Sequence, residues 1–290
     1  KLQVICQSKV VDLIFENRKV KGVRLENGQD ISGERVILAT GGASYSFTGS
    51  DATGINMARK FGHAIVPLRA GLIPLMIKQD YIKKLEGLTL HNIKLKFSDG
   101  KTEIVSDIGE LLFTAFGISG PLVITASGKV VDLLFQNKKV HVSIDLKPGL
   151  SAQLLNNRLL REFEVNAKKN VKNMLKNLLP LRLITVFMQV AGLDPFKKCS
   201  QITQKEREGI VLWLKNFHLD ISGARPIEEG MITRGGVSLK DIDPRTMESR
   251  LIKGLYFCGE MIDLDADTGG FNLQAAFSTG YLAGESAALS

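Results

Sequence analysis

The sequence has few cysteines and histidines, and neither kind is arranged to bind a metal. Among 290 residues there are three cysteines and four histidines. Cys6, Cys199 and Cys258 lie far apart, so no CxxC pair occurs, and the histidines form no HExxH motif. These absences argue against a zinc site and against a redox dithiol. We therefore expect no metal centre, and an odd number of dispersed thiols fits a reducing compartment, the cytoplasm.

Long apolar runs are also absent. No run approaches the roughly 18 residues that a membrane-spanning helix needs. The opening, KLQVICQSKV, lacks the charged, apolar and small-residue regions of a signal peptide. It also lacks a methionine and begins in strand-like sequence, which suggests a chain cut from a longer one. With 44% hydrophobic and 23% charged residues, the composition is that of a soluble globular protein.

No G-x-G-x-x-G occurs anywhere in the chain. A dinucleotide-binding βαβ unit uses those glycines for its turn, for its pyrophosphate contact and for helix packing. The sequence therefore holds no fingerprint of a first dinucleotide half-site.

Acidic residues are too few to balance the basic ones. The net charge is +8 and the pI is near 9.3, which raises nucleic acid or an anionic membrane as partners. No aromatic residues interleave usefully with the cations of residues 158–182, and leucines there supply an ordinary core face. A solvated face is the favoured interpretation, so we expect neither a nucleic-acid nor a membrane partner, and an RNA-associated role stays as an alternative. The cations concerned are Arg158, Arg161, Lys168, Lys169, Lys172, Lys176 and Arg182.

What the sequence does contain is a strong pattern at its C-terminal end. An apolar run, residues 255–258, breaks at Gly259, and an acidic loop leads to the pair Gly269-Gly270. This pattern predicts a buried strand, a polar loop and a helix that begins near Asn272. The helical face that recurs at this spacing is expected to pack against a sheet, and its small residues allow close approach; its members are Leu273, Ala276, Phe277, Gly280, Tyr281 and Gly284. The first N–H groups of that helix and its dipole would favour an electron-rich ligand. An ordinary strand-turn-helix without a ligand is the alternative.

A second glycine pair follows the N-terminal strands. Runs at residues 4–6, 10–15 and 20–25 predict an antiparallel hairpin or meander. The β-branched run 35–40 predicts a strand buried on both faces, and it ends at Gly41-Gly42, where a ligand can approach the backbone closely. Residues 49–62 predict a helix.

The middle of the chain changes from strands to helices. Alternating segments at residues 72–76, 93–97, 101–105, 109–113 and 140–144 predict a small antiparallel barrel or sandwich, with a helix at 122–135. Residues 151–215 predict three or four helices, with Ser151 as an N-cap and a capping box from Thr203 to Glu206. Residues 225–233 are expected to rejoin the barrel.

These segments together resemble the HI0933-like flavoproteins, also called the aminoacetone oxidase or BaiN-type family. The resemblance covers the whole chain. The runs that carry it are residues 37–42, 109–114, 116–121, 235–239, 244–249 and 254–290.

The resemblance implies an α/β fold: a Rossmann-like FAD-binding domain with an inserted antiparallel β-barrel and a helical cap. In the family the G-x-G-x-x-G unit precedes the point where this sequence begins, so we expect the N-terminal part of the FAD domain to be missing here. The implied domains are residues 1–65 and 234–290 for FAD binding, 66–149 and 218–233 for the barrel, and 150–217 for the cap.

The resemblance also implies a set of cofactor contacts. The Thr40-Gly41-Gly42 corner would lie against the FAD adenosine and pyrophosphate, and the flavin would lie across the start of the last helix. Glu260 would accept hydrogen bonds from ribityl hydroxyls, whereas Asp263 could equally be solvated. Because a half-site is expected to be missing, FAD is expected to bind this chain weakly or not at all. The implied contacts are Val10, Thr40, Gly41, Gly42, Gly259, Glu260, Asp263, Gly269, Gly270, Phe271, Asn272 and Leu273.

The activity implied by the resemblance is hydride transfer between FAD and a small organic substrate, with NAD(P)H or oxygen as second partner. The alternative is a non-enzymatic fragment or binding module with a degenerate flavin site. No catalytic acid or base can be named, because the family's Phe-Thr-His is replaced here by Phe113-Thr114-Ala115. The substrate and the oligomeric state do not follow from the sequence.

Overall fold

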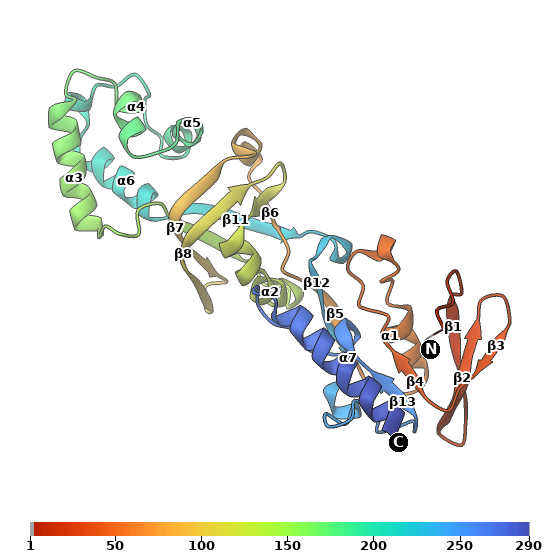
Figure 1. The fold of residues 1–290 in the computed structure, drawn as a ribbon. Helices are drawn as coiled ribbons and strands as arrows, with labels where there is room; N and C mark the ends of the chain where they lie inside the picture. The colour runs from red at the N-terminus through yellow and green to blue at the C-terminus, as the bar shows by residue number, and fades with distance from the viewer. Residues whose placement is uncertain (1–2, 290) are drawn as a thin grey trace. The chain divides into compact units, whose positions relative to one another are not determined.

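The computed structural model describes residues 3–289 and falls into two compact units (Figure 1). Unit 1 is formed by Lys1–Leu72 and Pro226–Ser290, of which Lys1, Leu2 and Ser290 lie outside the described residues. Unit 2 is formed by Ile73–Arg225. The chain thus leaves unit 1, completes unit 2 and returns.

An antiparallel meander opens unit 1. It consists of β1 (Val10–Glu16), β2 (Lys19–Leu25) and β3 (Asp30–Ser32), with Leu13 opposite Val23. The predicted hairpin is therefore confirmed. The predicted strand at residues 4–6 is wrong, since this exposed segment pairs with no strand of the described chain.

A parallel pair of strands lies at the centre of unit 1. β4 (Val36–Leu38) pairs with β13 (Leu255–Phe257), and α7 (Phe271–Leu289) runs along them (Figure 1). α1 (Thr53–Lys60) completes this part of the unit. The predicted strand-loop-helix at the C-terminal end is confirmed. β4 is shorter than predicted and is not buried on both faces, because Ile37 is 38% exposed.

The packing of α7 differs from the prediction. Phe277 and Tyr281, expected to face the sheet, are 70% and 72% exposed. The helix instead turns Ala283 inward, and Thr279 anchors it by accepting a hydrogen bond from Gly259 N at 3.0 Å. Because apolar residues lie on every side of this helix, their spacing could not identify the buried face.

A second two-stranded sheet in unit 1 corrects another expectation. β5 (Ile65–Gly71) pairs antiparallel with β12 (Ile232–Val237). Residues 225–233 therefore do not rejoin the barrel. Extended sequence shows that a strand can form, but it does not select the partner.

Unit 2 is built on a closed antiparallel barrel in the order β10-β11-β6-β9-β8-β7. The predicted strands at 101–105 and 109–113 are one long strand, β8, whose pairing with β7 shifts register twice. The predicted barrel helix is α2 (Pro121–Phe135). The strands are β6 (Leu75–Ile77), β7 (Thr89–Ser98), β8 (Glu103–Phe113), β9 (Gly117–Ser119), β10 (His141–Asp145) and β11 (Phe217–Ala224).

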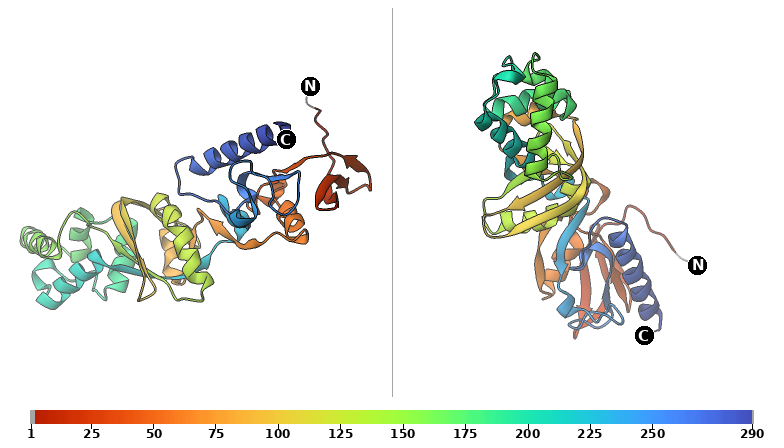
Figure 2. Two further views of the ribbon diagram at one scale, coloured as in Figure 1. Left: turned by 90° about the horizontal axis from the view of Figure 1, so that it is seen from below. Right: turned by 90° about the vertical axis from the view of Figure 1, so that its left-hand side faces the viewer.

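Four further helices of unit 2 lie together at one end of the barrel (Figures 1 and 2). Ser151 Oγ accepts from Leu154 N, and Thr203 and Glu206 form a reciprocal capping box, so both predicted caps are confirmed. The helices are α3 (Ala152–Val165), α4 (Val171–Met174), α5 (Leu181–Val190) and α6 (Gln204–Lys215). The short 3₁₀ helices are η1 (Ser46–Thr48), η2 (Asp80–Leu85), η3 (Leu175–Asn177), η4 (Cys199–Gln201), η5 (Ile227–Glu229), η6 (Leu239–Asp241) and η7 (Gly259–Met261).

Each unit has its own hydrophobic core. The barrel and the four helices share one cluster of 39 buried residues, whereas the cluster of unit 1 holds 17. The architecture is therefore α/β, with an antiparallel barrel and helices inserted into unit 1, as predicted. The division of the insert into separate barrel and cap domains stays a prediction. Within residues 3–289, no helix has the length and apolar character needed to span a bilayer.

Candidate functional site

The carboxyl ends of β4 and β13 meet side by side. The strands pair in parallel up to Leu38 opposite Phe257, and Cys258 N donates to Leu38 O at 3.2 Å. The segments that follow, Thr40-Gly41-Gly42 and Gly259-Glu260, therefore leave the sheet at the same edge. In α/β proteins, ligands bind beyond this edge.

The first glycine pair is required by close packing. Gly41 has a left-handed φ of +75°, and an added Cβ would lie 2.6 Å from Ser50 Oγ. At Gly42 the added Cβ would lie 2.2 Å from Thr233 Oγ1. Any larger residue at Gly42 would displace β12 from this corner.

Glu260 ties the two strand ends to β12. Its Oε1 accepts a hydrogen bond from Thr233 N at 2.5 Å, and Gly42 N donates to the same carboxylate. Thr233 Oγ1 accepts in turn from Ala43 N at 2.7 Å and from Ser44 N at 3.0 Å. Three segments far apart in the sequence are locked together by one carboxylate and one hydroxyl.

Burial raises the pKa of Glu260, and the hydrogen bonds from the Thr233 and Gly42 amides act in the opposite direction. The sequence-based prediction gave this carboxylate to a ligand hydroxyl. In the structure its oxygens already accept backbone amides, so its first role is to hold the corner. Each oxygen retains a further lone pair for a ligand.

The start of α7 is shaped by the second glycine pair. Gly269 has a φ of +120° and Gly270 a φ of +85°, and open space surrounds the position of a Cβ on Gly270. Asn272 fixes the preceding loop, because its Nδ2 donates to Ala266 O at 2.7 Å while its Oδ1 accepts from Ala266 N at 2.9 Å. The first N–H groups of the helix are thereby held at its open end.

A cavity of about 360 Å³ lies between η7, the first turns of α7 and the end of β12. Its wall is mostly apolar, and Glu260 is its one ionisable side chain among the lining residues. The lining residues are Met231, Ile232, Thr233, Gly259, Glu260, Ile262, Leu264, Asn272, Leu273, Ala275 and Ala276.

A second cavity in unit 1, of about 430 Å³, lies beside β1 and β4. Lys9 and Asp51 give it two charged groups, 3.7 Å apart. The lining residues are Lys9, Val10, Val23, Val36, Ile37, Leu38, Thr40, Gly49, Asp51, Thr53 and Met57.

The predicted cofactor residues fall into four groups, and Asp263 belongs to none of them. Val10 and Thr40 line the cavity beside β4, whereas Gly259, Glu260, Asn272 and Leu273 line the cavity at α7. Gly41 and Gly42 form the corner of β4, and Gly269, Gly270 and Phe271 form the mouth of α7. Asp263 lines neither cavity. Its N–H donates to Val237 O at 2.9 Å, and burial and the nearby Asp265 raise the pKa of its carboxyl.

Thr233 and Ser44 were missed by the sequence analysis. Thr233 meets Ala43 and Ser44 across 189 to 190 positions of sequence, and only the fold brings them together. The nearest signal was the adjacent pair Gly235-Gly236, which has left-handed φ values of +86° and +123°. Residues 3–289 contain no cluster of three or more potential metal-ligating side chains.

Several known proteins are similar in sequence to this chain over most of its length. The chain is 29% identical to the 3-dehydro-bile acid delta(4,6)-reductase of Clostridium scindens, over 97% of this chain and 72% of the relative. It is 28% identical to the ribosomal RNA dihydrouridine synthase of Escherichia coli, over 88% of this chain and 61% of the relative. The enzyme of that name from Haemophilus influenzae is 29% identical over 96% of this chain and 67% of the relative. The chain thus spans about two thirds of the length of these relatives.

A solved structure of Aquifex aeolicus GidA aligns with 98% of this chain and 46% of its own, at 13% identity and a TM-score of 0.35. The model of the HI0933-like protein Rossmann domain matches residues 1–286. This chain, with its parallel strand pair and glycine corners, belongs to the HI0933-like family.

Proposed function

We propose that unit 1 forms part of the FAD-binding site of an oxidoreductase. The observation that carries the proposal is the pair of parallel strand ends whose glycine corners are locked by Glu260 and flanked by two cavities. The corner fits a dinucleotide, since its glycines allow close backbone approach and the helix mouth offers N–H donors. The family match and the names of the relatives support this proposal.

The two cavities would divide the cofactor between them. Val10 and Thr40 would hold the adenosine, and Gly41 and Gly42 would face the pyrophosphate. The residues at the mouth of α7 would hold the flavin end, with Leu273 as an apolar wall. When bound, FAD supplies hydride transfer.

The residues of this chain would support that chemistry in two ways. The N-terminus of α7 stabilises negative charge at its mouth by roughly 0.5–2 kcal/mol. Ile262, Leu264 and Leu273 line the cavity with apolar surface, which limits water there. Glu260 keeps the corner rigid, so the described part of the cavity offers no uncommitted proton donor.

Reduction is the direction that the relatives favour. One printed name describes a bile acid reductase, and the other describes synthesis of dihydrouridine in ribosomal RNA. We propose that the protein adds a hydride and a proton across an activated carbon–carbon double bond. The hydride would come from NAD(P)H by way of the cofactor, and the proton from water. Oxygen is the alternative second partner.

Titration of the purified chain with FAD, followed by flavin absorbance and fluorescence, tests the proposal. FAD is expected to bind this chain weakly, because a half-site is expected to be missing, but more tightly than FMN, because both cavities take part. Gly270→Val should weaken FAD binding at least ten-fold, while Gly28→Val should not, although both glycines have a φ of +85° and open space around the Cβ position. Equal FAD affinity in the two variants would refute the site.

Reduction then distinguishes an enzyme from a binding module. FAD-loaded protein is expected to lose its flavin absorbance when NADH or NADPH is added without oxygen. If FAD binds at the glycine corner but neither nicotinamide reduces it, the non-enzymatic alternative is favoured. The absence of a histidine after Thr114 is the observation that keeps this alternative open.

A further inference from the structure

Nearly all of the excess charge lies in one part of unit 2. Residues 151–215 contain 12 lysines and arginines against five acidic residues, a net charge of +7 out of +8 for the chain. All other residues together contribute +1. These 65 residues form the helices α3 to α6 and their connections. A concentration of one sign on one region is the electrostatic footprint of a polyanion site.

Five of these lysines are exposed and carry uncompensated charge. Within the described residues, none of the five has a carboxylate oxygen within 4.0 Å. Lys197, in contrast, is paired with Glu206 at 2.6 Å. We call the five the lysine patch; its members are Lys168, Lys169, Lys172, Lys176 and Lys198.

Backbone hydrogen bonds place these lysines next to one another. Cys199 N donates to Lys169 O at 2.9 Å, and Val171 N donates to Lys197 O at 2.9 Å. The segment that carries Lys198 is therefore fastened beside the segment that carries Lys168 and Lys169. Lys172 and Lys176 follow one helical turn apart, on the exposed side of α4 and η3.

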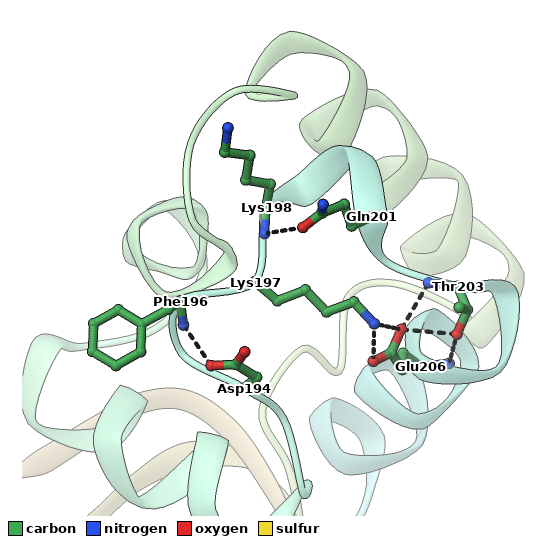
Figure 3. A network of polar contacts seen from close by, with 7 residues as sticks. All are labelled: Asp194, Phe196, Lys197, Lys198, Gln201, Thr203 and Glu206. Carbon is green, nitrogen blue, oxygen red and sulfur yellow. Dashed lines mark hydrogen bonds and ion pairs between the residues drawn. The ribbon is translucent and has the colours of Figure 1, made fainter.

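An exposed aromatic residue lies on the same loop as Lys198, two positions before it. Phe196 is 78% exposed, and Figure 3 shows its ring pointing away from the polar network that holds its loop. Phe196 N donates to Asp194 Oδ1 at 2.9 Å, and the next residue, Lys197, is fixed by Glu206. The loop backbone is thus held in place while the ring remains in solvent.

We propose that the lysine patch and Phe196 form a docking surface for RNA. The lysines supply phosphate contacts, and a flat ring on a fixed loop supplies a stacking platform for an unpaired base. The two relatives named for ribosomal RNA favour RNA over other polyanions. Use of this surface in catalysis rests on the proposed reductase function, but docking itself needs no flavin.

The fold supplies what the sequence did not show. Along residues 158–182 no aromatic residue interleaves usefully with the cations, so the sequence favoured a plain solvated face. Phe196 lies outside that stretch and reaches the patch only through the pairing of residues 167–171 with 197–200. The tertiary structure thus brings the loop of Phe196 to the lysines of residues 168–172, although the two segments are separated in the sequence.

Binding of the 290-residue chain to a uridine-containing stem-loop RNA tests the proposal, with affinity measured across salt concentrations. Lys172→Gln combined with Lys176→Gln should weaken binding roughly ten-fold near physiological salt and lower the salt slope by about 1.4. Lys240→Gln combined with Lys253→Gln makes the same charge change in unit 1 and should leave the affinity within two-fold. Equal losses in the two double variants would overturn the proposal.

Phe196 separates RNA from a membrane surface. Phe196→Ala and Phe196→Leu should both weaken RNA binding by roughly ten-fold, because neither residue has a ring to stack on a base. Phe47→Ala, at a residue 85% exposed in unit 1, is the matched control and should change nothing. Binding to anionic phosphatidylserine vesicles that Phe196→Leu preserves, without RNA binding, would assign the surface to lipid and overturn the proposal.

Because these measurements use flavin-free protein, they fail or succeed independently of the cofactor proposal. RNA binding without FAD binding would leave the docking surface standing and remove the reductase. FAD reduction without RNA binding would support the reductase and remove the docking surface.

Discussion

The two units are similar in length but differ in the number of hydrophobic residues that they bury. Unit 2 has 153 residues and 39 in its buried hydrophobic cluster, whereas unit 1 has 137 residues and 17. The barrel closes on itself and so leaves no open sheet edge. Unit 1 has three small separate sheets, and its longest helix turns Phe277 and Tyr281 to solvent. Unit 2 therefore has the larger buried core, whereas unit 1 holds both cavities of the proposed cofactor site.

The largest expected effect follows from the two cores. Phe97 in the barrel and Phe257 in β13 are both fully buried. Replacing either by alanine should cost about 3–5 kcal/mol. We expect chemical denaturation to show two transitions, with unit 1 unfolding first. Hydrogen exchange of peptides from each unit is the probe that assigns each transition to a unit. Phe257→Ala should lower the denaturant midpoint of the first transition only, and Phe97→Ala that of the second transition only. A single transition shifted equally by both variants would contradict the comparison.

The next effect tests the glycine corner. Gly42→Ala places a Cβ 2.2 Å from Thr233 Oγ1, so the change should destabilise unit 1 by about 1–3 kcal/mol. Gly149→Ala in unit 2 is the control, because its Cβ position has nothing within 4 Å and its φ is not left-handed. Differential scanning calorimetry measures both. An unchanged first transition in Gly42→Ala would mean that the corner is looser than its contacts indicate.

A smaller effect is expected at the capping box of α6 in unit 2. Thr203 Oγ1 accepts from Glu206 N at 3.3 Å, while Glu206 Oε2 accepts from Thr203 N at 2.8 Å. Thr203→Ala should cost about 1 kcal/mol. Amide exchange should speed up in the first turn of α6 and in the Phe196 loop, which Glu206 holds through Lys197. Thr203→Ser retains the hydroxyl and should behave like the native chain.

The smallest effect concerns pH. His63 in unit 1 is buried, its Nε2 lies 2.7 Å from Ser249 Oγ, and burial lowers its pKa below the ordinary 6.5. Between 6.5 and that lowered pKa the unfolded chain binds more protons than the folded one, so stability falls as the pH falls through this window.

His63→Gln should remove this loss, which is at most about 1.4 kcal/mol per pH unit. Comparison of the first transition in the native chain and the variant at pH 7 and below 6.5 measures it. Burial raises the pKa of Glu260, whose contribution has the opposite sign, and the difference between native chain and variant cancels that contribution. The second transition should be the same in both, because His63 lies in unit 1 and packs in its core.

Local patterns predicted the elements of both units well. The caps at Ser151 and Thr203, the hairpin of β1 and β2, and the strand-loop-helix of the C-terminal end follow from residues close together in sequence. Two of the errors lie where a choice of partner was needed. β12 pairs with β5 rather than with the barrel, and α7 buries a different face from the one expected.

The sequence alone determined the α/β fold class, the membership of the HI0933-like family and the glycines of the candidate site, because each depends on short runs of particular residues. Only the tertiary structure decided that Glu260 and Thr233 lock the corner, and that Phe196 stands beside the lysine patch. The physical reason is that burial and hydrogen bonding act between residues that are close in space, and the sequence records spacing along one dimension only.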